Sequence, residues 1–489
     1  MREKIERGCL TIITIAVLAC FFTPAGGNEL RLSTMGNCSI ALYDKDNQLN
    51  PFDYGLNPAY LLRDYDREWI RFTTGLEERS GHLKRKYDPY LTNNFYAGFM
   101  GIKKLGDRHV TSGSVTYQRL SEREIFHSLE IDQYNDPFYL TDLTTGDFEY
   151  YGPSLSANYS IRIKDNLHLG AGLQYDISTG LKQEYTRPEI VHNYIKATLG
   201  MIYEHSSGYM FGLTLSPIRN RNRTNFDKTD EGYDNIINRY SGEGIYEVRS
   251  FSSKQISEEE WGGEVTVQNF YLGRNLKLGS MLTYALHQTE SRYDAFERDL
   301  MSFWETERYD FRFLGRYTPE GMPLTVGITG RLMTNDGWAK RPEYEDVLLY
   351  DNPYRMASIG GGVSYLIEPL NVTATADYIM NSYDIEANDY GASLFRSAEV
   401  IQNIGRVGME YSLFGLHSVR LGFEMIDYPI DRWLKLPANM DSYRITGGFG
   451  YQFGFWNIEM QLMYSDRSRE GVNETRQGLS GIMWFTLLR

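Results

Sequence analysis

Charged side chains of both signs recur at alternate positions within stretches of this sequence that are otherwise apolar. Three consecutive stretches carry Arg406 and Glu410, Arg420 and Glu424, and then Arg444. Charges that face one another pair, and charges that line a narrow pore also decide which solutes pass through it. If such stretches are the strands of a barrel, one face of each strand lines its lumen. The charged residues predicted to share this inward face are Arg162, Lys196, Arg331, Asp377, Arg406, Glu410, Arg420, Glu424, Arg444 and Glu459.

This charged set has two interpretations. In the first, the side chains form an eyelet whose transverse field orients polar or anionic solutes. In the second, they form a salt-bridged ladder that fills the lumen or clamps the N-terminal segment. The second interpretation is favoured, because inward charges of both signs usually pair with each other.

The eight histidines are scattered, and no H-x-x-x-H motif or Cys/His cluster accompanies them. The sequence therefore predicts no metal site and no cofactor. Hydrolysis by a Ser-His-Asp set in a barrel wall would depend on His168, His192 or His287. No nucleophile with a distinctive context accompanies these three, so no catalytic residue is predicted and a barrel-wall hydrolase is a less favoured alternative.

The elements that carry these charges alternate with a period of two. In stretches of about 10–14 residues, such as 167–177 and 443–453, every second side chain is apolar or aromatic, which indicates β-strands. Sandwich strands are about 5–6 residues long, whereas a tilted transmembrane strand needs about 9–11. The length predicts an all-β fold, a transmembrane antiparallel β-barrel of about 18 strands. Sixteen strands are possible if the region 245–251 hides a pairing.

The links between the predicted strands alternate between short and long, as they do in barrels with short periplasmic turns and long extracellular loops. The longest predicted loop is 219–260, which either folds inward, binds partners or lies in solvent. Aromatic residues make up 14% of the chain, and such residues gather at both membrane interfaces. The predicted girdle residues are Phe95, Tyr96, Tyr150, Tyr151, Tyr203, Tyr284, Phe453, Phe455, Trp456, Trp484 and Phe485.

The net charge and the hydropathy exclude two classes of protein. A net charge of -14 argues against nucleic acid as a partner, and a mean hydropathy of -0.45 excludes a multi-span helical membrane protein. The single long apolar run, Leu10 to Phe22, follows Arg2, Lys4 and Arg7. It predicts a secretory signal peptide over residues 1–27. An alternative is a lipobox that ends at Cys20, which would then carry a lipid anchor.

Residues 28–65 are too apolar for a solvated tail and are predicted to form a partial plug ahead of a barrel that spans 66–489. They contain Asn57, Pro58 and Ala59. This motif resembles the Asn-Pro-Ala segment of the long-chain fatty-acid transporter superfamily, which lies in the barrel mouth as a hatch. The whole layout resembles an uncharacterised outer-membrane barrel family of Bacteroidota, and that family has no established activity.

The sequence thus predicts a porin-like protein of the outer membrane of a Gram-negative bacterium, and not an enzyme. The favoured function is a passive channel or transporter for small hydrophobic or amphipathic molecules, whose partners are outer-membrane lipid and such a solute. One alternative is a non-conducting scaffold that binds envelope proteins through its long loops. The other is the hydrolase considered above.

Overall fold

The computed structural model describes fourteen stretches of the chain. The predicted signal peptide, Cys20 and most of residues 28–55 lie outside the described residues. The described stretches are residues 39–42, 56–64, 68–84, 87–128, 137–184, 187–226, 235–241, 245–251, 255–293, 300–340, 347–413, 417–427, 440–469 and 472–488.

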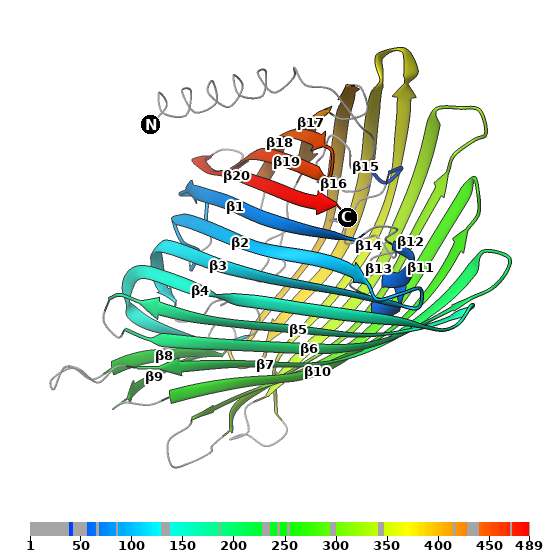
Figure 1. Ribbon diagram of the computed structural model, residues 1–489. Helices are drawn as coiled ribbons and strands as arrows, with labels where there is room; N and C mark the ends of the chain where they lie inside the picture. Colours follow the sequence, from blue (N-terminus) through cyan, green and yellow to red (C-terminus); the bar gives the residue numbers. More distant parts are fainter. Residues whose placement is uncertain are drawn as a thin grey trace.

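Among the described residues, twenty strands form one antiparallel sheet, and eighteen of them close into a barrel (Figure 1). The first strand, β1, pairs with both β2 and the last strand, β20, which closes the ring. β7 pairs directly with β10, so the hairpin of β8 and β9 is not part of the closed ring of strands. This hairpin pairs instead with the first residues of β4, at the end of the barrel with the long loops. The predicted barrel of about 18 strands is confirmed.

The strand bounds are β1 Trp69–Gly81, β2 Leu91–Lys104, β3 His109–Ser128, β4 Phe138–Lys164, β5 Leu167–Lys182, β6 Glu189–Glu204, β7 Tyr209–Asn225, β8 Asn235–Ser241, β9 Ile245–Phe251, β10 Gln255–Leu272, β11 Leu276–Tyr293, β12 Leu300–Tyr317, β13 Leu324–Lys340, β14 Leu348–Ile367, β15 Val372–Asp389, β16 Leu394–Leu413, β17 His417–Ile426, β18 Met440–Phe453, β19 Trp456–Arg469 and β20 Val472–Leu488. The short helices are η2 Pro58–Tyr60, α2 Leu61–Asp64 and η3 Glu368–Leu370.

Burial alternates along the strands, as the period of two predicts. On β6, Leu199 is 61% exposed on the outer face, whereas Thr198 on the inner face is 7% exposed. Exposed Leu, Ile, Val and Phe side chains recur at the outward positions around the ring. An outward apolar belt around a closed antiparallel barrel is the lipid-facing surface of an outer-membrane protein. The chain is therefore an outer-membrane β-barrel of a Gram-negative bacterium.

Aromatic side chains border this belt, as in the Tyr284–Tyr309 and Trp456–Phe485 pairs, whose ring centroids lie 5.0 Å and 4.9 Å apart. Three predicted girdle residues point inward instead. Tyr96, Tyr150 and Trp484 occupy inward register positions, opposite Gly75, Gly180 and Glu459. Adjacent residues in a strand face opposite sides, so only one member of each predicted neighbouring pair can face lipid.

Several strands extend well beyond the residues needed to cross a membrane. β4 has 27 residues and β7 has 17, although about 9–11 suffice for a crossing. The predicted loop 219–260 is therefore corrected: its ends, 219–225 and 255–260, are paired wall strands, and it also contains β8 and β9. Beyond the belt both faces meet water, so the apolar alternation that reveals a strand in the sequence disappears.

No helix within the described stretches is long and apolar enough to cross a membrane.

Candidate functional site: the inner segment and the lumen wall

Two described pieces of the N-terminal region, residues 39–42 and 56–64, lie inside the barrel, and we call them the inner segment. η2 and α2 contact the inner sides of β3, β4, β5 and β6 (Figure 1). Asn57 begins η2 as its N-cap, and Pro58 at the first helical position has no N–H left to satisfy. Pro58, Ala59 and Tyr60 are all buried.

The Asn57 carboxamide joins the inner segment to two strands. Its Oδ1 accepts a hydrogen bond from Ala59 N over 3.1 Å, which fixes the turn. Its Nδ2 donates to the carbonyl of Met201 on β6 over 3.2 Å and to Gln268 Oε1 on β10 over 2.9 Å. Ser160 Oγ on β4 donates to the carbonyl of Ala59 over 3.1 Å. A few directional bonds therefore hold this piece of chain against the wall.

Glycines in the wall leave room for the inner segment. A Cβ at Gly170 would lie 2.2 Å from the backbone nitrogen of Ala59, and one at Gly200 would lie 2.3 Å from Asn57 Oδ1. These two glycines face each other directly across β5 and β6. The segment therefore packs on bare backbone, and any larger residue at these positions would displace it.

A second attachment lies across the barrel. Ser39 Oγ donates to Asp377 Oδ1 over 2.6 Å, and the backbone N–H of Ile40 donates to the same carboxylate at 3.2 Å and 3.3 Å. Arg316 Nε donates to the carbonyl of Ile40 over 3.1 Å. A Cβ at Gly327 would lie 2.4 Å from that carbonyl oxygen. The sequence-predicted Asp377 therefore attaches the inner segment to the wall.

Buried apolar side chains surround both attachments and form one cluster at the end of the barrel with the short turns. Its members are Ile40, Ala59, Tyr60, Leu61, Trp69, Ile102, Val110, Ile202, Met210, Phe270, Leu314 and Ile379. The inner segment contributes four of these, and wall strands contribute the others. The cluster therefore occupies the periplasmic end of the lumen.

All ten charged residues predicted to share a face lie at inward positions, and several pair with each other. Arg420, with 0% of its side chain exposed, contacts Glu410 at 3.3 Å and Glu459 at 2.7 Å. Glu459 lies two strands away from Arg420, beyond β18. Gly450 on β18 makes this possible, because a Cβ there would lie 2.6 Å from Glu459 Oε1 and 2.9 Å from the Arg420 guanidinium.

Glu424 joins two further members of the set, since Arg406 Nε lies 2.6 Å and Arg444 Nε lies 3.2 Å from its oxygens. Arg331 and Lys196 pair with carboxylates that the sequence did not single out. Arg331 lies 2.8 Å from Asp310, and Lys196 lies 2.5 Å from Glu264.

Arg162 lies opposite His168 near the periplasmic end, and its Nε makes no hydrogen bond within the described residues.

Asp310 and Glu264 were not among the residues predicted from the sequence, because their strands mix polar and apolar side chains on the inner face. Asp310 also contacts Arg312 at 2.6 Å, and Glu264 contacts Arg308 at 2.9 Å. The alternation Arg308, Asp310, Arg312 along β12 was a usable signal, since three charges at a spacing of two share one face.

Of the three histidines considered for hydrolysis, His192 and His287 lie near Glu260 on the inner wall, whereas His168 lies near the periplasmic end. His168 Nε2 lies 3.2 Å from Glu204, His192 Nδ1 lies 2.6 Å from Asn222, and His287 Nδ1 lies 2.7 Å from Glu260. Their side-chain partners within the described stretches are thus carboxylates and an amide. In the same stretches, no group of three or more His, Cys, Asp or Glu side chains is arranged to hold a metal ion.

Three apolar clusters follow one another along the inner wall of β12 to β15 from the loop end toward the inner segment, with the charged side chains of Arg331 and Asp310 beside them, and we call these clusters the apolar strip. At the loop end Trp304, Ala339, Tyr350 and Ala387 form a buried cluster, and Phe138 from the outer end of β4 packs on it. The next cluster contains Tyr354, Tyr383 and Ile385, with Met333 and Met356 packed against it. Ile379 and Leu314 then lead into the cluster around Ile40.

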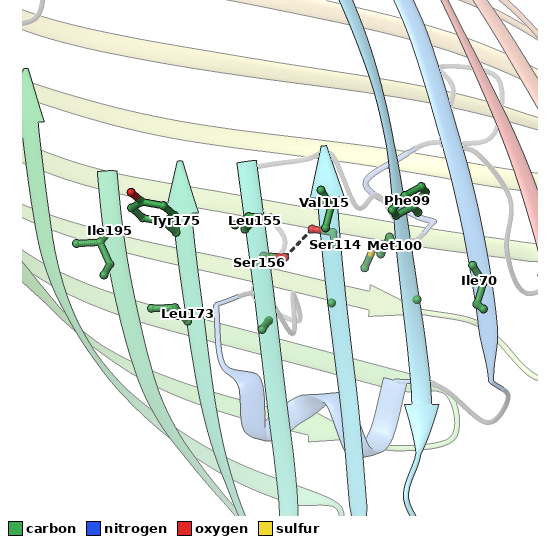
Figure 2. A pocket seen from close by; sticks show the side chains of 13 residues that line it. Ile70, Phe99, Met100, Ser114, Val115, Leu155, Ser156, Leu173, Tyr175 and Ile195 are labelled. Atoms are coloured by element: carbon green, nitrogen blue, oxygen red, sulfur yellow. Dashed lines mark hydrogen bonds between the residues drawn. The ribbon is translucent and has the colours of Figure 1, made fainter. Parts of the chain in front are cut away.

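A separate hollow of about 570 Å³ lies in the wall formed by β1 to β6 (Figure 2). Gly101, Gly113 and Ala157 lie side by side across β2, β3 and β4 at outward positions, with Ile70 and Leu155 beside them. Most of its lining therefore belongs to the lipid-facing surface, and the hollow is not part of the lumen.

Comparisons with known proteins place the chain in a family and beside known barrels. A family model described as a family of unknown function, DUF6850, matches residues 58–400. No curated protein matches the sequence. That the family is uncharacterised agrees with the resemblance seen in the sequence, while the bacterial phylum stays a prediction.

Three of the similar solved structures illustrate the range. The unliganded ferric citrate transporter FecA has a TM-score of 0.46 and 10% identity, over 87% of this chain and 79% of that one. The toluene transporter TodX of Pseudomonas putida has a TM-score of 0.35 and 12% identity, over 94% and 100%. A FadL homologue of Pseudomonas aeruginosa has a TM-score of 0.34 and 11% identity, over 90% and 95%. Scores and identities in this range say nothing about what this chain carries.

Proposed function

The chain belongs to the family of unknown function DUF6850, and we propose that it is a passive channel for small hydrophobic or amphipathic molecules. In this proposal the inner segment is a plug at the periplasmic end of the lumen. The solute enters from the loop end, moves along the apolar strip and leaves when the plug shifts.

The observation that carries this proposal is the apolar strip of β12 to β15. Its clusters place apolar side chains at intervals along the inner wall, and Met333 and Met356 are only partly buried, so a solute in the lumen can contact them. In this proposal these partly buried side chains offer a hydrophobic solute favourable contacts on its way along the wall. Several weak contacts suit passage better than one strong site, because a solute must also leave.

The form of the attachment supports the role of the inner segment as a plug. Asn57 makes two hydrogen bonds to the wall, and the Ile40 turn rests on Asp377 and Arg316. Besides these polar contacts, the segment packs into the buried apolar cluster through Ile40, Ala59, Tyr60 and Leu61. A segment held in this way can shift as a unit when the barrel wall stays intact.

The test is uptake of the hydrophobic fluorescent probe 1-N-phenylnaphthylamine by Gram-negative cells that express the chain. Met356→Gln makes the strip polar with little change in volume and should lower the rate of uptake severalfold. Met463→Gln is the matched control, since Met463 occupies an inward position on β19, opposite Ser480 and far from the strip. Equal uptake by cells with and without the chain would contradict the channel proposal. Equal effects of both variants would show that the strip does not guide the solute.

A further inference from the structure

Four adjacent strands each carry an arginine at an inward position in the half of the barrel nearer the loops. We call these residues the arginine cluster: Arg444 on β18, Arg467 on β19, Arg476 on β20 and Arg79 on β1. Arg467 stands directly opposite Arg476. Two positions farther toward the periplasm on the same two strands, Ser465 stands opposite Gly478. Arg444 on β18 stands opposite Ser465, and Arg79 on β1 stands opposite Gly478, so these two arginines lie on either side of the Ser465–Gly478 pair.

Like charges directly opposite each other in an antiparallel pair repel and destabilise the sheet. The Cβ atoms of such a pair lie about 4.5–5.5 Å apart, and diagonal neighbours lie about 7–8 Å apart. Burial and the positive charges of Arg79, Arg444 and Arg476 accordingly lower the pKa of Arg467, whereas the carboxylate of Asp88 raises it. An arrangement that costs stability in the empty barrel calls for a compensating negative charge.

The carboxylates described around the cluster contact three of its four arginines. Arg79 pairs with Glu77. Glu424 contacts Arg444 but is shared with Arg406.

Arg476 lies 3.9 Å from Asp88, at the limit of an ion pair. Within the described part of the chain, the Arg467 guanidinium has no carboxylate at ion-pair distance.

The cluster surrounds a floor of small residues. A Cβ at Gly478 would lie 2.6 Å from Ser465 Oγ and 3.4 Å from Arg79 Cγ, so the glycine keeps the space between the arginines open. The Arg79 and Arg444 side chains are 53% and 38% exposed. Their guanidinium groups can therefore reach a solute that enters from the loop end.

We propose that the arginine cluster binds a soluble oxyanion that carries at least two negative charges, such as a phosphate ester, a sulfate or a polycarboxylate. Guanidinium groups donate paired hydrogen bonds that match the geometry of such oxyanions. The cluster faces the lumen and not the lipid, so its ligand is a solute and not a membrane headgroup. The site is independent of the channel proposal, since it requires binding and not passage.

The charges on the facing wall support this assignment. β10 and β11 lie about halfway round the closed ring from β20 and β1. Their inner face carries Glu258, Glu260 and Glu264, of which Glu260 contacts His287 and Glu264 contacts a lysine and an arginine. On the facing wall the carboxylates thus stand beside cations, whereas the row from β18 to β1 brings four arginines together.

The proposal is tested by titrating the purified full-length barrel in detergent at low ionic strength with pyrophosphate, sulfate and citrate, with calorimetry as the readout. Arg467→Gln should weaken binding of the preferred anion by about tenfold to a hundredfold, as the loss of one hydrogen bond between charged groups implies. Arg308→Gln is the matched control, because Arg308 also lines the lumen but contacts the carboxylate of Glu264 at 2.9 Å. Comparison of the three anions identifies the chemical class.

Thermal unfolding supplies a second readout that does not depend on binding. Without added anion, Arg467→Gln should raise the unfolding temperature, because the substitution removes repulsion from the other arginines. If Arg467 were merely structural, the same variant would unfold at a lower temperature and the proposal would fail. It would also fail if none of the three anions bound the native barrel more tightly than the Arg467→Gln variant. Neither result would alter uptake of the hydrophobic probe, so this inference and the channel proposal stand or fall separately.

Discussion

Replacement of Asn57 by alanine should release the plug from the wall. The substitution removes the hydrogen bonds from Asn57 Nδ2 to Met201 and to Gln268, and each such bond contributes about 0.5–1.5 kcal/mol net. The seated state should therefore lose about 1–3 kcal/mol relative to the released state, in which water solvates the freed groups. Since 1.4 kcal/mol is a factor of ten, the ratio of open to closed time should rise by about 5-fold to 150-fold.

The measurement is single-channel recording of the full-length chain in planar bilayers, with the open-to-closed dwell ratio as the readout. The matched control is Asn381→Ala, which removes a buried hydrogen bond of 3.0 Å to Gln402 between two wall strands and belongs to neither of the two described attachments of the inner segment. The heat-dependent gel shift of folded barrels shows that each variant is intact. If Asn57→Ala and Asn381→Ala changed the dwell ratio equally, or if neither changed it, the plug would not gate this barrel.

Three other substitutions separate the parts of the lumen. Arg420→Met should lower the free energy of unfolding in denaturant by about 3–5 kcal/mol, because it leaves two buried carboxylates without a cation, whereas Arg355→Met on the exposed outer face should change it by less than about 0.5 kcal/mol. Gly170→Ala should raise conductance, because its Cβ would collide with the plug backbone, and an unchanged conductance would show that the segment can move aside. Asp377→Ala should expose the Ile40 turn to protease added at the periplasmic side, and equal cleavage of the native chain would contradict the second attachment.

The fold was predictable because the membrane imposes one rule on every strand that crosses it. Outward side chains meet lipid and inward ones do not, so the period of two is visible wherever the belt lies. The rule ends at the edge of the belt. That is why the outer parts of β7 and β10 were predicted as a loop, although Arg219 and Arg221 on β7 pair with Glu259 on β10 at 3.4 Å and 2.9 Å.

The inward direction of the charged side chains followed from the same rule, but their partners did not. Partners across a short turn are fixed by the turn itself, so Arg420 and Glu410 could be matched from the sequence. Arg420 and Glu459 could not, because their contact passes over Gly450 on an intervening strand. Nor could Asp377 be assigned to Ile40, since that contact joins positions 337 residues apart.

The same reasoning explains why the arginine cluster was not visible in the sequence. β19 and β20 are joined by a turn at the loop end, and β20 meets β1 only when the barrel closes. Closure brings Arg79, near the start of the chain, beside Arg476, near its end. A sequence shows which charges face inward, but only the register and the closure show which of them lie together. Here they bring like charges side by side around Arg467, which has no carboxylate at ion-pair distance among the described residues, and this is where a ligand is to be sought.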